Sequence, residues 1–415
     1  MEFLRKNGFD LQSLDAEAIL QEFLSAMRKG LAGDGDLPML PSGFLLPETL
    51  PVNCEIPAFD VGGTNIRSAR ICFDANGVPS VTHQLRGYMP GSRGPVDHNT
   101  FYHVLCDVLR PNIRDGETLG YCFSYPVDLH GVLLFWTKHI EASSIIRTNV
   151  VGDLIKELNR RGSSNIKVRI LNDTVAALLA TYARHAAENL AGYVGFILGT
   201  GTNTAYAERA EAITKTPNFP KGSFVPINCE SGNFSAFPHS RFDERYEALS
   251  GNTRAQWERC ISGVHLGPLG TEILHAAAEE GLFSAGLRDV ILSSTYTNVE
   301  LDSFCAGLTP DVIYCSVKEA QLLRDLLCPM YERAARFAAI NIAAAAIQSA
   351  SARNMDHGLI RVNVDGSTFW KTASVPFVDL VHHQLEALLK PRGYSCELIR
   401  IDDAPLIGAA MATHS

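Results

Sequence analysis

Two turns that share the sequence Gly-Thr-Asn limit the possible architectures of this chain more than any other feature. Ala58 and Phe59 lead into the turn segment at 60–65, and the apolar run at 193–198 leads into the turn at 199–203. Glycine tolerates positive φ and, without a Cβ atom, lets backbone amides approach an anion closely. One such turn is a weak signal, since hairpins also use glycine without binding anything. Two copies predict a duplicated strand–turn–strand architecture, whose turns face each other across a cleft and hold nucleotide phosphates.

A carboxylate accompanies each turn. The first turn carries Asp60, an acid that a Mg²⁺-phosphate would need and a plain hairpin would not. Asp173 lies between a predicted strand at 167–171 and a predicted helix that starts at Thr174. An acid in that position is often only an N-cap. From spacing alone, Asp173 is equally a helix cap or a catalytic base.

Length, charge and cysteine usage exclude several classes of protein. With 415 residues, 46% of them hydrophobic, the chain is long enough for two globular domains. A net charge of −9 argues against a nucleic-acid-binding surface. The ten cysteines show no zinc-ligand spacing, and no signal peptide or membrane anchor is visible, so we expect reduced thiols in a cytoplasmic protein that binds no membrane.

Further motifs between and beyond the turns give a more specific indication. In chain order they are residues 123–126 (Phe-Ser-Tyr-Pro), 136–138 (Trp-Thr-Lys), 172–174 (Asn-Asp-Thr), 228–232 (Asn-Cys-Glu-Ser-Gly), 256–263 and 364–367. Together with both turns, this series resembles the eukaryotic-type hexokinases over nearly the whole chain. The resemblance implies an α/β, actin-like ATPase (ribonuclease H-like) fold, with two domains built on mixed sheets around a cleft. The scattered cysteines disfavour the bacterial ROK sugar kinases, because their zinc-binding cysteine cluster has no counterpart in this sequence.

The resemblance also implies an activity. The expected enzyme is an ATP-dependent hexokinase or glucokinase that transfers the γ-phosphoryl of ATP to the 6-hydroxyl of glucose or a related hexose, the first step of glycolysis. Its cofactors would be ATP and Mg²⁺, its ligands a hexose and a nucleotide, and its assembly a monomer or a homodimer. Asp173 would be the catalytic base, and Lys138 would contact both the sugar and the transferring phosphoryl group. On local sequence alone, Lys138 is instead a solvated strand end.

The remaining site residues follow from the same resemblance. The sugar would be held by Ser124, Thr137, Lys138, Asn172, Asp173, Asn203, Glu230 and Glu258. The nucleotide would be bound by Asp60, Gly62, Gly63, Thr64, Asn65, Arg67, Gly199, Thr200, Gly201, Asp365, Gly366 and Ser367, with Asp60 reaching Mg²⁺ through water. As isolated residues, Glu230 and Glu258 would be surface charges.

Boundaries and local structure are also predicted. Residues 51–203 with 404–415 would form a small domain that carries both turns and Asp173, and residues 1–50 with 204–403 a large domain. We expect an amphipathic N-terminal helix that buries Ile19 to Leu31, a strand at 132–136, and a helix from Val317 to Ala350 that Pro329 kinks or breaks.

Two alternatives remain open at the level of sequence. The chain could be a regulator that binds hexose without converting it, or an actin- or Hsp70-like ATPase that shares only the fold. A kinase specific for mannose, fructose or an amino sugar is a third possibility, because the segment from Ser124 to Thr137 is shorter than in the animal enzymes. Ser231 stands where those enzymes usually have tryptophan, and residues 402–408 lack the family's glycine-rich segment.

Overall fold

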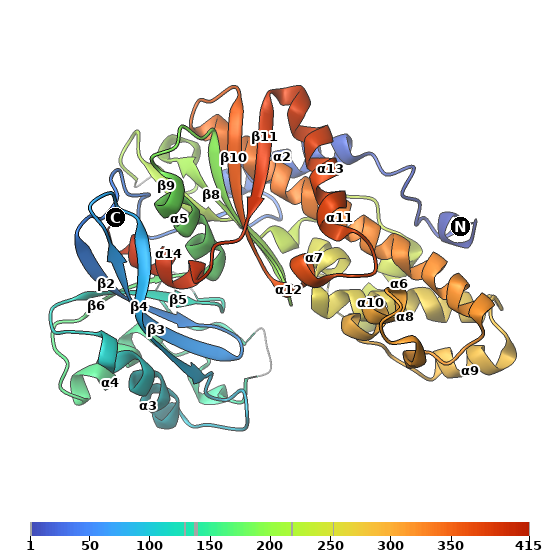
Figure 1. Ribbon diagram of the computed structural model, residues 1–415, viewed down its shortest axis with the longest axis horizontal. Helices are drawn as coiled ribbons and strands as arrows, with labels where there is room; N and C mark the ends of the chain where they lie inside the picture. The colour runs from blue at the N-terminus through green and yellow to red at the C-terminus, as the bar shows by residue number, and fades with distance from the viewer. Residues whose placement is uncertain (1, 128–129, 137–139, 217–218, 252, 415) are drawn as a thin grey trace.

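Two mixed β-sheets flanked by helices form the framework of the protein (Figure 1). The computed structural model describes residues 2–127, 130–136, 140–216, 219–251 and 253–414. The architecture confirms the α/β fold class predicted from the sequence. Both glycine turns are tight connections between antiparallel neighbours, the first in the five-stranded sheet and the second in the six-stranded sheet.

The five-stranded sheet has the order β4-β3-β2-β5-β6, with β5 and β6 parallel to β2. Successive side chains of a strand point to opposite faces. Ala58 and Cys122 therefore pack toward α14, whereas Phe59 and Tyr121 pack toward α3 and α4. The elements are β2 (Cys54–Val61), β3 (Asn65–Phe73), β4 (Pro79–Tyr88), α3 (His98–Leu109), β5 (Thr118–Phe123), α4 (Val150–Arg160), β6 (Lys167–Leu171) and α14 (Ala404–Ala412).

The six-stranded sheet has the order β1-β9-β8-β7-β10-β11. Helix α5 packs on one face and α11 on the other, and α13 packs on α11 (Figure 1). The elements are β1 (Leu40–Pro41), α5 (Asp173–His185), β7 (Gly192–Leu198), β8 (Thr202–Arg209), β9 (Phe224–Asn228), α11 (Val317–Ala352), β10 (Gly358–Asp365), α13 (Phe377–Leu389) and β11 (Tyr394–Ile399). Strand β11 was not predicted.

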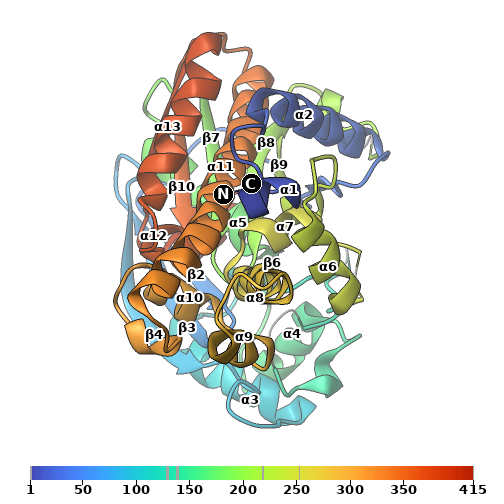
Figure 2. The same cartoon turned by 90° about the vertical axis from the view of Figure 1, so that its right-hand side faces the viewer.

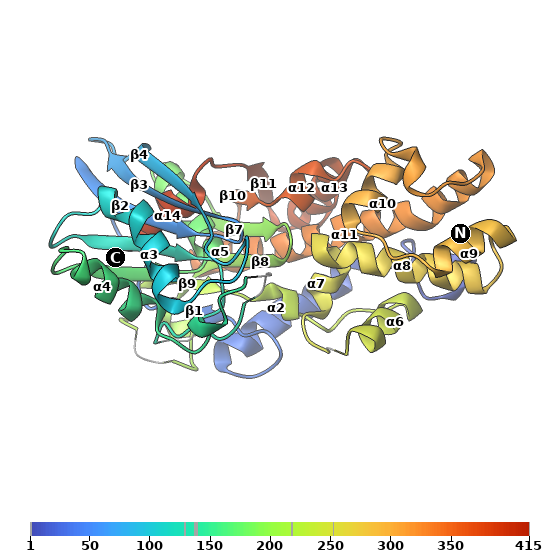
Figure 3. The same cartoon turned by 90° about the horizontal axis from the view of Figure 1, so that it is seen from below.

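A group of helices extends beyond this sheet, arranged around α8 (Figures 2 and 3). Helix α8 contacts α6, α7, α9, α10 and α11, so α11 joins the sheet to this group. The helices are α6 (Arg241–Ser250), α7 (Gln256–Ile261), α8 (Gly263–Glu279), α9 (Ala285–Leu292) and α10 (Asn298–Cys305). Shorter elements elsewhere are α1 (Glu2–Lys6), α12 (Ser367–Lys371), η1 (Arg110–Asn112), η2 (Ser143–Ile145), η3 (Ala210–Ala212), η4 (Ser231–Asn233), η5 (Pro310–Val312) and η6 (Lys390–Arg392).

Helix α2 (Ala16–Ala32) confirms the amphipathic helix predicted near the N-terminus. The predicted apolar side chains from Ile19 to Leu31 are buried, and α2 packs on α11. The Asp15 carboxylate caps the helix by accepting a hydrogen bond of 3.0 Å from the Ala18 amide. The predicted long helix also exists, but α11 continues through Pro329 without starting a new helix.

The strand predicted at residues 132–136 is wrong. Among the described residues, this segment has isolated bridges at Val132 and Leu133 in place of a ladder. Leu133 is fully buried, and the Trp136 indole donates to the Ala142 carbonyl at 3.0 Å. Leu133 and Trp136 thus pack into a core while Phe135 is exposed, and a short apolar run cannot by itself distinguish such packing from strand pairing.

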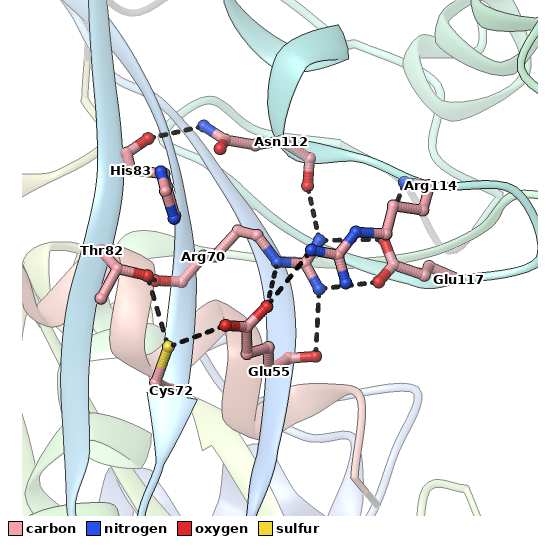
Figure 4. Close-up of polar contacts among 8 residues, drawn as sticks. All are labelled: Glu55, Arg70, Cys72, Thr82, His83, Asn112, Arg114 and Glu117. Atoms are coloured by element: carbon pink, nitrogen blue, oxygen red, sulfur yellow. Dashed lines mark hydrogen bonds and ion pairs between the residues drawn. The ribbon is translucent and has the colours of Figure 1, made fainter.

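Arg70 on β3 is the centre of a polar cluster in the five-stranded sheet (Figure 4). Its side chain is almost fully buried, and the guanidinium donates to the carboxylates of Glu55 and Glu117, each at 2.8 Å. It also donates to the Asn112 carbonyl at 2.9 Å. A buried charge is costly unless it is paired, and here two carboxylates provide the pairing. The cluster fastens β2 and β3 to the segment that precedes β5.

The connection from one sheet to the other runs through α5. Strand β6 belongs to the five-stranded sheet and β7 to the six-stranded sheet, so the predicted strand–helix–strand unit spans both. Helix α5 also packs on α14, which in turn packs on β2 and β5. The domain boundary after Asn203 stays a prediction, whereas the boundary between the sheets lies earlier in the chain, at α5.

Candidate active site

The start of α5 excludes one of the two interpretations of Asp173, the helix cap. The side-chain oxygen of Asn172 accepts a hydrogen bond of 2.9 Å from the Thr174 amide, which makes Asn172 the N-cap. Asp173 occupies the first helical turn, where its carboxylate accepts a bond of 3.3 Å from the Thr174 hydroxyl. Because the capping position is already filled, the half-buried Asp173 carboxylate is available for another role.

The first glycine turn connects β2 to β3 beside a buried ion pair. Asp60, at 5% exposure, accepts two hydrogen bonds from the Arg67 guanidinium, at 2.8 and 2.9 Å. Arg67 also donates to the Asp403 carboxylate at 2.8 Å. Burial raises the pKa of Asp60, and the positive charge of Arg67 offsets part of this effect. The turn at 62–65 has half-buried glycines and an exposed Thr64.

The surroundings of Asp60 fit a magnesium ion carried by a nucleotide. Mg²⁺ is usually bound through one or two carboxylates, retained waters and substrate phosphates, and seldom by an all-protein cage. Both bonds from Arg67 go to Oδ2 of Asp60, so Arg67 does not engage Oδ1. Within the described part of the chain, no three His, Cys, Asp or Glu side chains are placed to hold a metal. A single buried carboxylate beside a glycine turn suits an ion that arrives with phosphates.

The second glycine turn connects β7 to β8 and is supported by two other segments. The Gly263 amide, at the start of α8, donates to the Gly199 carbonyl at 2.8 Å. Gly366 follows β10 with a φ of +118°, and a Cβ atom at this position would lie 2.2 Å from the Leu198 carbonyl oxygen. Only glycine lets the end of β10 approach the turn this closely.

Glu230 follows β9 with an unusual backbone conformation. Its φ of +52° lies in the left-handed region, which non-glycine residues adopt mainly where the surrounding structure imposes it. The carboxylate accepts hydrogen bonds from the side-chain amides of Asn228 at 2.8 Å and Asn203 at 3.4 Å. Strands β8 and β9 thus bring two of the predicted sugar residues, Asn203 and Glu230, into contact.

Glu258 on α7 contacts the second turn directly. Its Oε2 accepts a hydrogen bond of 2.7 Å from the Thr202 amide. A Cβ atom at Gly201 would lie 2.6 Å from the same oxygen. The residue before α7, Ala255, also has a left-handed backbone, with a φ of +56°. A left-handed backbone conformation thus occurs at Glu230 itself and at Ala255, just before the helix that carries Glu258. The sequence patterns did not indicate either one.

The acidic groups of the site act on one another. Asp173 adds to the larger effect of burial in raising the pKa of Asp60. Burial likewise raises the pKa of Glu230; the bond from Asn228 opposes this effect, and the charges of Asp173 and Glu258 strengthen it. Since charge–charge interactions fall off with distance, Asp173 lies near both Asp60 and Glu230.

The other predicted residues have varied outcomes. Ser124 comes directly after β5, and its amide donates to the Val61 carbonyl at 3.1 Å, next to the first turn. The Tyr125 hydroxyl donates to the Gly62 carbonyl of that turn at 3.2 Å. Thr137 and Lys138 lie outside the described residues, so their roles stay predictions.

A cavity of about 710 Å³ adjoins the second turn. Thr200 and Ser367, both from the predicted nucleotide set, line it, and Asp365 precedes Gly366 at the exposed end of β10. No motif indicated the rest of its wall, because α6 and the segment before α10 meet only through their packing on α8. These residues include Tyr246, Leu249, Val264, Pro268, Thr271, Glu272 and 295–299.

Comparison with known protein families identifies the family to which this chain belongs. Two family models, each described as hexokinase, match residues 193–415 and 4–183. The first alone spans more than half of the chain. The chain belongs to the hexokinase family. Members of this family are ATP-dependent hexose kinases, and the comparisons support the same activity here.

Individual hexokinases extend the match. Hexokinase-1 of Saccharomyces cerevisiae is 27% identical over 376 residues, which cover 81% of this chain and 76% of the yeast protein. Hexokinase-2 of Arabidopsis thaliana is 33% identical over 283 residues, which cover 62% of this chain but only 55% of the plant protein. The structure of a Schistosoma mansoni hexokinase complexed with glucose has a TM-score of 0.78 at 24% identity, and the alignment covers 100% of this chain and 97% of that one. This likeness confirms the predicted actin-like ATPase fold.

Alanine at position 201 tests the contact between the second turn and Glu258 in this hexokinase. The new Cβ atom would displace Glu258 Oε2 from the Thr202 amide, because it would lie 2.6 Å from that oxygen. A hydrogen bond to a charged group contributes about 1.5–3 kcal/mol, so the dissociation constant for hexose should rise roughly 10- to 100-fold. Calorimetric titration with glucose measures this change.

A matched glycine provides the control for this substitution. Gly286→Ala on α9 places a Cβ atom with no neighbour within 4 Å and should leave hexose affinity unchanged. Unaltered glucose binding by Gly201→Ala, with native thermal stability, would contradict a role of this contact in holding Glu258.

Proposed function

We propose that this hexokinase transfers the γ-phosphoryl of ATP to the 6-hydroxyl of glucose or a related hexose, as the first step of glycolysis. The observation that carries the proposal is the position of Asp173. This acid is free of a capping role, and its charge acts on both Asp60 and Glu230. A proton acceptor placed between a phosphate turn and a set of hydroxyl-binding groups is what transfer to a sugar hydroxyl requires.

Phosphoryl transfer needs positioning more than covalent chemistry. In our proposal, Asp173 takes the proton from the attacking 6-hydroxyl, and Lys138 adds a point charge near the transferring group. Carboxylates and amides bind ring hydroxyls, because they provide acceptors and donors in fixed directions. The ring would be held by Ser124, Thr137, Lys138, Asn172, Asn203, Glu230 and Glu258.

The nucleotide would lie across the two turns, with its nucleoside in the cavity beside Thr200 and Ser367. The backbone amides of the turns and the hydroxyls of Thr64 and Thr200 would donate to phosphate oxygens. Mg²⁺, when bound with ATP, neutralises phosphate charge. Asp60 would orient a water toward it, held in place by Arg67. The same set includes Gly62, Gly63, Asn65, Gly199, Gly201, Asp365 and Gly366.

Closure of the proposed domains over sugar would keep water from accepting the phosphoryl group. Water is far more concentrated than any hexose, so selection against it requires that the site assemble only around bound sugar. We expect small-angle scattering to show a smaller radius of gyration at saturating glucose than without sugar. An unchanged radius would count against closure.

The acidic set predicts a pH dependence of sugar binding. Burial, together with Asp173 and Glu258, raises the pKa of Glu230 above the ordinary value of 4.5. A carboxylate with a raised pKa is protonated first as pH falls, so glucose affinity should weaken at a pH above the ordinary glutamate range. Asn228→Ala removes a bond that stabilises the charged form and should move this loss to still higher pH. Constant affinity down to about pH 4.5 would contradict the prediction.

Location and assembly are further proposals. All ten cysteines are free, which supports a cytoplasmic location. None of the helices in the described ranges is long and apolar enough to cross a membrane. Homodimer formation is open to a direct test by light scattering.

A coupled assay of ADP formation tests the function. Glucose, mannose, fructose, glucosamine and N-acetylglucosamine would be offered as acceptors, with ATP, GTP and pyrophosphate as donors. The proposal requires ATP-dependent turnover of at least one hexose, and the ratio of kcat/KM values defines specificity. Hexose binding without turnover would support a sugar-sensing regulator. ATP hydrolysis without hexose binding would support an actin- or Hsp70-like ATPase.

A further inference from the structure

We infer that His265 is a positioning residue that couples the nucleotide-side cavity to the sugar carboxylate Glu258. The inference rests on the proposed function, which assigns Glu258 to the sugar. Three side chains from three helices form a continuous series: Tyr246 of α6, His265 of α8 and Glu258 of α7. No sequence motif indicated His265 or Tyr246, because neither belongs to the series that resembles hexokinases.

The distances define the order of the groups. The Tyr246 hydroxyl oxygen and Nδ1 of His265 are 2.6 Å apart, and Nε2 of His265 lies 3.8 Å from Oε1 of Glu258. At 3.8 Å this contact is longer than a hydrogen bond, so it acts through charge, and a proton on Nε2 would be attracted to the Glu258 carboxylate. With the proton on Nε2, the Tyr246 hydroxyl would donate to Nδ1, and the Nε2–H group would point its positive end at Glu258. Each member of the series orients the next.

The same carboxylate is held on its other side by the phosphate turn. Oε2 of Glu258 accepts the bond of 2.7 Å from the Thr202 amide, whereas Oε1 faces His265. The helix that carries His265 is itself fastened to the turn, because the Gly263 amide donates to the Gly199 carbonyl at 2.8 Å. Both oxygens of this sugar ligand are thus controlled by elements on the nucleotide side.

Tyr246 links the proposed nucleotide cavity to His265 and Glu258. Its side chain lines the cavity of about 710 Å³ together with Thr200 and Val264. A nucleoside in the cavity would contact Tyr246 and restrict its hydroxyl, which orients His265 and through it Glu258. Coupling between two binding sites is reciprocal. Nucleotide should therefore raise the affinity for sugar, and sugar the affinity for nucleotide, through His265.

Steady-state kinetics and calorimetry of the full-length chain test this inference. Glucose is titrated without and with a saturating non-hydrolysable ATP analogue and Mg²⁺, which gives the coupling factor between the two ligands. For His265→Leu, we expect the glucose KM to rise about threefold to tenfold, with kcat within about twofold, because an interaction with non-reacting hydroxyls contributes to binding and not to the chemical step. The coupling factor should fall at least about threefold.

Two conservative variants separate positioning from packing. His265→Gln keeps an N–H donor within reach of Glu258 and should recover most of the KM. Tyr246→Phe keeps the aromatic wall of the cavity and loses only the hydroxyl. It should reduce the coupling factor while the glucose affinity of the nucleotide-free protein stays within about twofold. His383→Leu, an exposed histidine on α13, is the chemical control and should match the unsubstituted chain.

Either of two results overturns the inference. His265→Leu could retain the original KM and coupling factor, or His265→Gln could lose as much as His265→Leu, which would indicate a packing role. If the unsubstituted chain phosphorylates no hexose, the proposed function fails and this inference fails with it. The activity of the unsubstituted chain therefore shows whether the proposed function or only the role of His265 has failed.

Discussion

Asp173→Ala is expected to lower kcat about 100- to 10,000-fold, the usual contribution of a general base. The loss should appear in kcat more than in the hexose dissociation constant, because in our proposal Asn203, Glu230 and Glu258 would still bind the ring. Asn172 caps α5 through its own side chain, so the substitution removes no cap and the helix should persist. Steady-state kinetics with glucose and ATP, beside calorimetry with glucose alone, measure both quantities.

Two further variants strengthen the interpretation of that loss. Asp173→Asn preserves shape and hydrogen bonding but cannot accept the proton, so it should be as inactive as the alanine variant. Asp153→Asn changes an acid in the first turn of α4, away from the site, and should retain full turnover. Turnover near that of the unsubstituted enzyme in either Asp173 variant would remove Asp173 from the mechanism.

Removing Asp243 should cause the largest loss of stability. Its carboxylate accepts two hydrogen bonds of 2.7 Å from the Arg333 guanidinium, and both side chains are at least nine-tenths buried. Asp243→Ala leaves the Arg333 charge buried and unpaired, beside the rings of Phe9 and Phe337. Breaking such a pair costs about 3–5 kcal/mol. Urea denaturation monitored by circular dichroism measures the change.

Two control variants distinguish the buried Asp243–Arg333 pair from surface charges. The double variant Asp243→Leu/Arg333→Met removes both charges and should recover much of the stability. Glu386→Ala breaks an exposed pair with Lys390 and should cost less than about 1 kcal/mol. A larger loss in the double variant than in Asp243→Ala would contradict the account.

The pH dependence of stability follows from the direction in which the pKa of Asp243 is shifted. Burial alone would raise the pKa of Asp243, but Arg333 and Ser240 hold it at about 2. Because this pKa is lower in the folded state, the pair contributes full stability above the unfolded value of about 3.9. The contribution is lost as pH falls from that value toward 2. Asp243→Ala should therefore show a flatter acid limb of stability than the unsubstituted chain.

The sequence alone predicted the parts of the fold that depend on local pattern. Helices α2, α5 and α11 were predicted from the spacing of apolar residues. The two turns were predicted from their glycines, because tight turns need this residue more than helices or strands do. The motifs also allowed the family to be recognised from residues such as Asp60, Asn172 and Glu258. Periodicity failed at residues 132–136, where side-chain burial resembled strand pairing.

The choice between cap and base for Asp173 could not be made from the sequence pattern. Spacing could not settle it, since Asn172 and Asp173 both precede the helical periodicity. The hydrogen bond from the Thr174 amide to Asn172 excludes the capping role, and the role of base stays a prediction. The left-handed backbone at Glu230 was equally invisible, because it is imposed by neighbouring strands and not by the residue's own preference.

The amino-acid sequence by itself determined that this chain is an α/β protein with two phosphate-type turns and an acid near each. Those features depend on propensities of neighbouring residues, which a linear pattern records. Tertiary structure alone decided which acids lie close enough to affect one another's pKa and which side chains line the cavity. It also decided that Tyr246 contacts His265, which in turn faces Glu258. These contacts join helices far apart in the chain, and they exist only because α6 and α7 pack together against α8.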